Sequence, residues 1–223
     1  MTRHVETLAD VWPLYGLRLR TGELVLRIPT EAELPAFVEL ARAGVHPPEE
    51  MPFGIAWTDV PSPAFERGFY QFHAGTRARW SPTEWTLTLG VWVDGAPAGF
   101  QDLGAREFAT YRTVHTGSWL GRSFQGRGVG KLMRQAALAL AFDHLGAEIA
   151  ESAALLDNAA SLGVSRGVGY EANGFERLAP RGEPREAQRF RMTLEGWRSR
   201  PRPEVVVEGL EGCLEMFGAA PRT

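Results

Sequence analysis

The chain has 223 residues, enough to bury a substantial core as one large domain or as a domain with an extension. A formal net charge of −3 and a pI of about 6.0 exclude a global basic field that would attract nucleic acid. No apolar run is long enough to span a bilayer, residues 1–6 lack a signal-peptide core, and the lone Cys213 excludes an internal disulfide, which together predict a cytoplasmic protein without a membrane partner.

The first third of the chain predicts two strands followed by two helices. Residues 17–20 and 23–28 alternate like a hairpin around Thr21-Gly22. Thr30 has the form of a helix cap, followed by acidic residues and then by an apolar helical face. The proline-rich residues 44–53 predict a loop, and another helix is expected within residues 63–79.

The middle of the chain predicts a hairpin and a third strand. Residues 85–93 and 98–103 are expected to be antiparallel strands joined through Asp94-Gly95, which is a strong hairpin signal. Residues 112–120 then form a strand that leads into a glycine-rich turn. Residues 132–142, rich in alanine and leucine, predict the helix that follows this turn.

The remaining residues complete one α+β domain with a mixed, mostly antiparallel twisted sheet flanked by helices. A strand is expected at 147–154, a short helix at 158–168 and a late strand at 185–194. The tail predicts a strand at 205–208 and a helix at 209–217. We expect the domain to span residues 17–197, with an N-terminal extension at 1–16 and a C-terminal extension at 198–223 that packs on the same domain.

The glycine-rich turn Gln125-Gly126-Arg127-Gly128-Val129-Gly130-Lys131 is the most informative segment. Glycines allow the backbone to approach an anion, and the free N–H groups and dipole of the following helix favour negative charge. The turn is not a P-loop, because Leu132 follows Lys131, and its glycine spacing does not fit the dinucleotide fingerprint. By itself the turn predicts either a phosphate site or a simple strand-to-helix connection.

Two motifs together resemble a known family. Residues 125–130 match the Q/R-x-x-G-x-G/A loop of the GNAT N-acyltransferase superfamily. Asn158 and Ser161, followed by Val164 and Gly169-Tyr170, resemble the N-x-x-S-x-x-V…G-F/Y segment of its RimJ/RimL-like branch. A second similarity, to a mycobacterial GNAT succinyltransferase, extends over residues 44–46, 51–53, 57–58 and 117–121 and the valine-rich tail.

The resemblance implies a GNAT fold, in which a splayed strand pair holds acyl-CoA. It implies an N-acyltransferase that moves an acetyl or succinyl group from acetyl-CoA or succinyl-CoA to a primary amine, by direct attack in a ternary complex and without a metal. The acceptor is a small molecule or a protein amine, and a homo-oligomer is compatible with the family. The alternative is a catalytically inactive GNAT-fold protein that binds acyl-CoA as a sensor or partner.

The resemblance also places the donor along the glycine turn and the strand before it. Backbone N–H groups of the turn would bind the pyrophosphate of CoA, and an N–H near the end of the strand would face the thioester oxygen. The expected cofactor-binding residues are Ser118, Trp119, Leu120, Gln125, Gly126, Arg127, Gly128, Val129, Gly130, Lys131 and Asn158. Trp119 is equally compatible with a core position, and Asn158 with a helix N-cap.

Three side chains are the candidates for proton transfer. Ser161 would donate a proton to the departing thiolate, although a serine in the first turn of a helix is also an ordinary structural residue. His115, on the strand before the glycine turn, is the first candidate for a general base, a role that histidine commonly fills. A role as an ordinary strand histidine accounts for His115 equally well. Glu186 is the second candidate for the base, although an ordinary surface charge explains it better, and Glu151 is the third.

The long proline-rich loop is the expected site of acceptor specificity. Loops of this length without regular structure are usually functional. The expected substrate-binding residues in it are His46, Glu50, Phe53 and Trp57. The sequence does not identify the acceptor amine.

Overall fold

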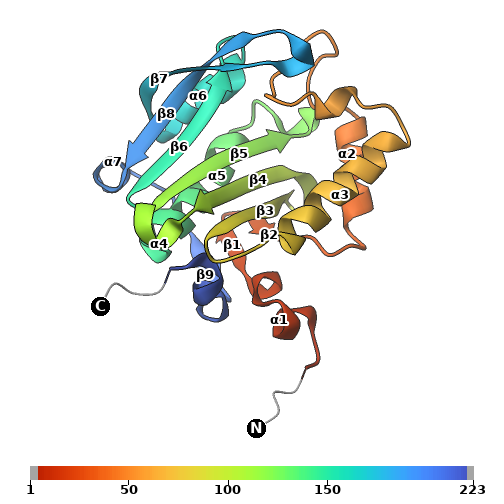
Figure 1. Cartoon of the computed structure of the whole chain (residues 1–223). Helices are drawn as coiled ribbons and strands as arrows, with labels where there is room; N and C mark the ends of the chain where they lie inside the picture. Colours follow the sequence, from red (N-terminus) through yellow and green to blue (C-terminus); the bar gives the residue numbers. More distant parts are fainter. Residues whose placement is uncertain (1–4, 220–223) are drawn as a thin grey trace.

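A mixed, mostly antiparallel sheet organises residues 5–219, which are the residues that this computed structural model describes (Figure 1). Its nine strands follow the order β7-β8-β6-β5-β4-β3-β2-β1-β9, and β5 pairs with β6 in parallel while the other neighbours are antiparallel. This confirms the predicted fold class. The strands are β1 (Arg18–Thr21), β2 (Leu24–Arg27), β3 (Glu84–Val93), β4 (Ala96–Arg106), β5 (Thr113–Leu120), β6 (Ile149–Leu155), β7 (Glu171–Leu178), β8 (Arg185–Thr193) and β9 (Val206–Glu208).

Helices cover both faces of the sheet. α5 packs across β1, β2, β4 and β5, whereas α2 packs on β4 and α3 on β3 from the other face (Figure 1). The α-helices are α1 (Leu8–Val11), α2 (Leu34–Arg42), α3 (Ala64–Ala78), α4 (Phe108–Tyr111), α5 (Val129–Ala139), α6 (Ala159–Val168) and α7 (Leu194–Arg198). A π-helical turn (Leu140–His144) continues α5, and short 3-10 helices lie at Pro13–Gly16, Trp57–Asp59, Arg122–Phe124, Pro180–Gly182 and Glu211–Phe217.

Successive side chains of β3 point to opposite faces of the sheet, and each face carries a hydrophobic core. Leu87 and Leu89 point into the larger core, which contains the apolar face of α5. Trp92 points to the opposite face, where it packs edge-on against Phe37 with ring centroids 5.1 Å apart. Phe37 also contacts Phe100 of β4 at 4.7 Å. The smaller core is therefore aromatic, and it lies on the face of the sheet that α2 and α3 cover.

The parallel pair β5–β6 opens after three residue pairs. Thr113, Val114 and His115 pair with Ile149, Ala150 and Glu151 respectively. Beyond this point β5 stays paired with β4 as far as Leu120, while β6 stays paired with β8. The carboxyl-terminal halves of β5 and β6 therefore diverge, as the resemblance implied for a splayed strand pair.

Most elements predicted from the sequence are present, including both hairpins, the long loop and the helix after the glycine turn. The predicted cap at Thr30 is wrong, because the Glu33 carboxylate accepts hydrogen bonds from the Thr30 N–H and Arg27, and α2 begins only at Leu34. Strand β7 was not predicted, and the helix expected at 209–217 is a 3-10 helix. Residues 1–4 and 220–223 of the two predicted extensions lie outside the described residues.

Candidate active site

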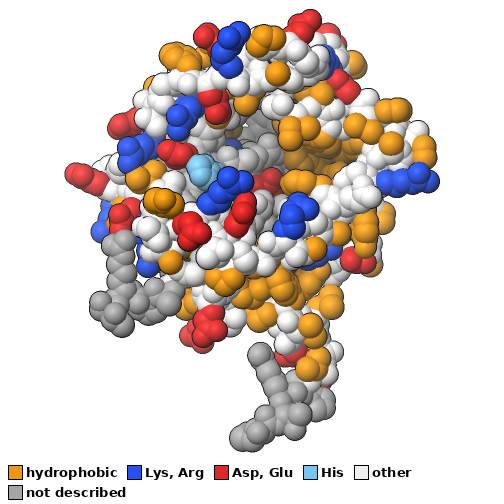
Figure 2. Space-filling view, viewed as in Figure 1, with side chains coloured by type: hydrophobic (Ala, Val, Ile, Leu, Met, Phe, Trp, Pro, Cys, Tyr) orange, Lys and Arg blue, Asp and Glu red, His pale blue; other side chains and the backbone are white. Residues whose placement is uncertain are grey.

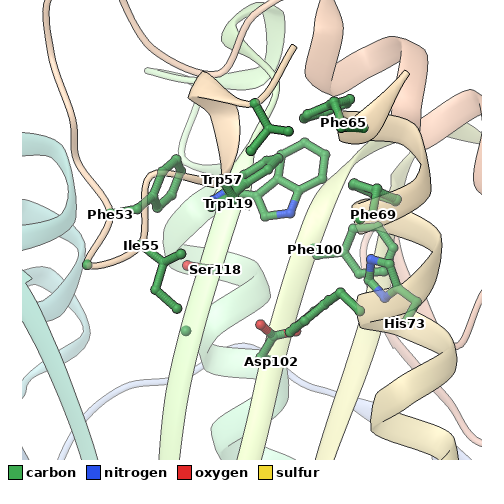
Figure 3. Close-up of a pocket in the computed structure, with 16 residues that line it drawn as sticks. Phe53, Ile55, Trp57, Phe65, Phe69, His73, Phe100, Asp102, Ser118 and Trp119 are labelled. Carbon is green, nitrogen blue, oxygen red and sulfur yellow. The ribbon is translucent and has the colours of Figure 1, made fainter. Parts of the chain in front are cut away.

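An apolar cavity of about 580 Å³ lies where β4 and β5 face α3 and the loop before it (Figure 3). In Figure 2, hydrophobic side chains gather beside the hollow on this face of the molecule. Four chain segments contribute to the cavity. Its lining residues are Phe53, Gly54, Ile55, Trp57, Val60, Ala64, Phe65, Gly68, Phe69, Phe72, His73, Phe100, Asp102, Gly117, Ser118 and Trp119.

The aromatic walls come from ordinary helix and strand periodicity. Phe65 and Phe69 are four residues apart and therefore lie on the same face of α3. Phe100 and Trp119 are cross-strand partners on β4 and β5, with ring centroids 5.7 Å apart. Trp57 of the long loop closes the group, because its ring lies 5.6 Å from that of Trp119 and stacks on Phe65 at 6.0 Å.

Asp102 is the one carboxylate in the cavity wall, and its position was not predicted. It lies two residues after Phe100 on β4, so both side chains point to the same face of the sheet. Its partner on β5 is Gly117, which has no side chain to cover the carboxylate. Oδ1 of Asp102 is buried and has no hydrogen-bond partner within residues 5–219. Burial raises the pKa of Asp102 to about 7, although the nearby Arg134 opposes this shift.

His73 is a neutral neighbour of the same cavity. Burial lowers its pKa to about 4, so that the imidazole is uncharged at neutral pH. Its Nδ1 lies 3.3 Å from the hydroxyl of Thr88, and Thr88 is the cross-strand partner of Asp102 on β3. His73 therefore adds polarity near Asp102 without adding charge.

Arg134 of α5 joins the strands at the point where they diverge. The side chain is buried, and its guanidinium donates to Ser118 of β5 at 3.0 Å and to Ser152 of β6 at 3.1 Å. It also donates to Gln101 of β4 at 3.3 Å. One side chain thus connects three strands. Its hydrogen bond to Ser118 also fixes a residue that lines the cavity.

The glycine turn has the geometry of an anion site. Gly126 and Gly128 have φ values of 71° and 81°, a conformation that favours glycine. None of the backbone N–H groups of residues 126–130 finds a hydrogen-bond acceptor within the described chain. Arg127 and Lys131 are exposed beside them. Free amides, positive charge and the start of α5 coincide here.

Gln125 and Asn158 have structural partners in this conformation. The Gln125 amide donates to the carbonyl groups of Leu120 at 2.8 Å and Val45 at 2.7 Å, and so ties the turn to the long loop. Asn158 is the N-cap of α6, since its Oδ1 accepts from the Ser161 N–H at 3.0 Å. Its amide donates to the Pro52 carbonyl at 3.2 Å. Ser161 is half-buried in the first turn of α6.

The candidates for the base that the sequence offered lie outside the cavity lining. His115 is exposed on β5, and its Nδ1 lies 3.6 Å from a carboxylate oxygen of Glu151. Glu186 is exposed on β8, where it is the cross-strand partner of Arg177. Of the titratable groups considered, Asp102 and His73 are those that face the cavity.

Some residues of the long loop line the cavity, and others form hydrogen bonds within the loop. Of the residues predicted to bind substrate, Phe53 and Trp57 line the cavity, whereas Glu50 is exposed. His46 is bonded within the loop, because Nδ1 donates to the Pro47 carbonyl at 2.8 Å and Nε2 lies 2.7 Å from the Thr58 hydroxyl. These contacts make His46 a residue that shapes the loop.

Arg181 and Arg185 connect this loop to the β7–β8 hairpin. Arg181 binds both carboxylate oxygens of Asp59, at 2.7 and 2.9 Å, and donates to the Pro48 carbonyl at 3.0 Å. Arg185 donates to the Met51 carbonyl at 2.9 Å. The wall that carries Phe53 and Trp57 is therefore anchored to the far side of the splay.

The opened parallel pair and the glycine turn with free amides are features that the resemblance to acyl-CoA-dependent acyltransferases implied. Residues 23–171, more than half of the chain, match the family model described as "Acetyltransferase (GNAT) domain". The chain belongs to this acetyltransferase family.

Solved structures show the same fold. RimJ from Mycobacterium smegmatis in complex with CoA-disulfide is 18% identical, with a TM-score of 0.69 over 91% of this chain and 95% of that one. A RimL ribosomal L7/L12 α-N-protein acetyltransferase is 20% identical, with a TM-score of 0.59 over 78% and 91%. A chimera of the spermidine N-acetyltransferase SpeG from Vibrio cholerae and hSSAT is 15% identical, with a TM-score of 0.60 over 80% and 100%.

No group of three or more metal-ligating side chains occurs between residues 5 and 219. In the same part of the chain, no helix has the length and apolar character needed to cross a bilayer.

Asp102 should make stability depend on pH. Its pKa is about 7 in the folded state, against an ordinary value of 3.8, so its favourable contribution to stability is present below about pH 4 and is lost as the pH rises through about 7. The asparagine of the Asp102→Asn variant cannot ionise. The melting temperature of the variant minus that of wild type should therefore increase from pH 5 to pH 8. Each pKa unit corresponds to about 1.4 kcal/mol, which gives at most a few kcal/mol. Thermal melts of both proteins across this range measure the effect.

Asp94→Asn is the matched control, because Asp94 is exposed in the β3–β4 turn, where asparagine tolerates a positive φ. Its melting temperature should follow that of wild type at each pH. Parallel curves for wild type and Asp102→Asn would contradict the assignment.

Proposed function

We propose that this protein transfers an acetyl group from acetyl-CoA to a primary amine by direct attack in a ternary complex. The observation that carries the proposal is the cavity between β4, β5 and α3, with the carboxylate of Asp102 in its wall. The free amides of the glycine turn support the donor half of the proposal. The CoA complex of the similar RimJ structure supports it too.

In this proposal the donor enters along β5 and the glycine turn. The N–H groups of residues 126–130 bind the pyrophosphate, and Arg127 and Lys131 supply positive charge beside it. The pantetheine arm then follows the unpaired edge of β5 between Ser118 and Leu120. The thioester would reach the cavity wall at Trp119, next to the proposed binding site of the amine.

The chemistry requires three proton transfers. The amine nitrogen attacks the thioester carbonyl, so that a C–N bond forms and the C–S bond breaks. We assign to Asp102 the proton that an ammonium must lose before attack, since its pKa of about 7 suits a base at neutral pH. Ser161 gives a proton to the thiolate, and the remaining proton of the nitrogen restores the Ser161 hydroxyl through solvent.

We favour acetyl over succinyl as the transferred group. A succinyl carboxylate needs a cationic partner once it is buried. None of the residues that line the cavity in the described chain is lysine or arginine. Arg134 is nearby, but its guanidinium already donates to Gln101, Ser118 and Ser152.

Coenzyme A should protect the protein from thermal unfolding. At a concentration about 100-fold above Kd, the stabilisation is about 2.7 kcal/mol, or roughly 5 °C or more for a chain of this size. Gly128→Val should abolish this protection, because the side chain occupies the position of the pyrophosphate. Gly22→Val, at a glycine with φ +55° in the β1–β2 turn, carries similar backbone strain and should keep the protection.

A failure of CoA to protect the wild-type protein would contradict the proposed function. Protection without thiol release across a wide amine panel would instead identify a protein that only binds acyl-CoA. Comparing acetyl-CoA and succinyl-CoA in the same thiol-release assay tests the choice of donor.

Ser161→Ala should lower kcat while leaving the Kd for CoA nearly unchanged. The reason is that the hydroxyl acts on the leaving thiolate, whereas the backbone N–H of residue 161, which Asn158 caps, is retained. Single-turnover rates and CoA titrations separate the two effects. If the rate is unchanged, another hydroxyl such as that of Tyr170, which lies 3.1 Å from Thr116 Oγ1, must supply the proton.

Asp102→Asn should lower kcat/KM by about 10²- to 10⁴-fold at pH 8. Wild-type kcat/KM should show an inflection near pH 7 that the variant lacks. The ionisation of the amine itself affects both proteins equally, so the ratio of their pH profiles isolates Asp102. An inflection retained in the variant would assign the base to another group, with His115 and Glu186 as the next candidates.

A further inference from the structure

Aromatic side chains form a large part of the cavity wall. Seven of the residues that line it are phenylalanine or tryptophan, contributed by the loop, α3, β4 and β5. Four of them converge closely: Trp57 lies 5.6 Å from Trp119 and 6.5 Å from Phe69, and Phe69 lies 6.0 Å from Phe100 (Figure 3). Such a surface binds apolar and aromatic groups strongly, and it binds cations over its ring faces.

Several cavity residues remain exposed although they are large and apolar. Ile55 is 77% exposed, Phe72 is 48% exposed and Val60 is 41% exposed. Exposed apolar side chains that surround one opening are typical of a binding site. The apolar character of the cavity therefore continues to its mouth.

The charges in the cavity are few and of one kind. Asp102 provides a carboxylate, and its buried Oδ1 has no partner among the described residues. His73 is uncharged and its Nδ1 is already engaged with Thr88. Ser118 already receives a hydrogen bond from Arg134. Among the residues of this lining, Asp102 is therefore the one that offers a carboxylate to a ligand, and rings surround it.

We propose that the acceptor is a small primary amine carried on an aromatic or bulky apolar body. Its ammonium group binds Asp102, and its body fills the space between α3, Trp57 and Trp119. This inference rests on the proposed acyltransferase function, because the acetyl group must reach the nitrogen at Asp102. The cavity volume of about 580 Å³ is within the range of small-molecule sites.

The same wall disfavours two other amines. A polyamine would bury a second ammonium that has no further carboxylate to pair with in this cavity. A peptide N-terminus would bury backbone N–H and C=O groups against aromatic carbon, where they lack hydrogen-bond partners. An arylalkylamine has one polar group, and Asp102 satisfies it.

The experiment compares three acceptors at saturating acetyl-CoA: phenethylamine, putrescine and the peptide Ser-Ala-Ala. Thiol release should give a kcat/KM for phenethylamine at least 100-fold above that of the other two. Isothermal titration of phenethylamine into the CoA-loaded protein should show binding. Asp102→Asn should remove most of this binding, which provides a readout that does not depend on turnover.

Phe72→Ala supplies a test at the mouth with little risk to folding, since the side chain is 48% exposed. We expect phenethylamine to bind about tenfold more weakly to this variant, because part of the apolar contact is removed. Tyr70→Ala is the matched control. Tyr70 lies on the same helix and is 46% exposed, but it does not line the cavity, so its binding should equal that of wild type.

The outcomes separate the two proposals. If CoA fails to protect the protein but phenethylamine binding still depends on Asp102 and Phe72, the acyltransferase function fails while the cavity preference stands. If thiol is released fastest with putrescine or Ser-Ala-Ala, the substrate class is overturned while the acyltransferase function stands. If Phe72→Ala weakens phenylacetyl-CoA but not phenethylamine, the cavity holds the acyl group, and the inference is again overturned.

Discussion

The buried guanidinium of Arg134 is the interaction on which the site depends. Removing this charge from water is costly unless each N–H group is bonded. The bonds go to Gln101 on β4, Ser118 on β5 and Ser152 on β6, so the charge is accommodated only when these three strands keep their positions. The opening between β5 and β6 is therefore a fixed feature of the core, because closing it would change the distances that satisfy Arg134.

The two faces of β5 have different neighbours. Towards α5, Val114 and Leu120 belong to the large core, and the strand leads directly into the glycine turn. Towards α3, Gly117 and Trp119 line the cavity. One strand thus contacts both the proposed donor path and the proposed acceptor site. Gly99 of β4 keeps this arrangement tight, since a Cβ there would lie 2.1 Å from the Trp119 carbonyl oxygen.

Local patterns in the sequence predicted most of the fold, and the resemblance predicted the splay. The Asp94-Gly95 hairpin and the helix after the glycine turn follow from turn chemistry and periodicity. Strand β7 was missed because Glu171–Leu178 is polar and mostly exposed, contains Gly174 and pairs with β8 through a bulge. Such a strand is defined by its partner, which no local pattern reveals.

The role of Asp102 was also not predicted, because it too depends on a residue of a neighbouring strand. An acid two residues after Phe100 on a strong central strand is a sign of a buried carboxylate, but its exposure to a cavity depends on Gly117, fifteen positions later and opposite it in register. Phe65 and Phe69 likewise have the spacing of any amphipathic helix. Burial raises the pKa of the Asp102 carboxylate, so its ionised form destabilises the empty protein at neutral pH, whereas an ammonium in the cavity would pair with the carboxylate and offset that cost. Binding of the acceptor would then stabilise the fold through the same carboxylate that receives its proton.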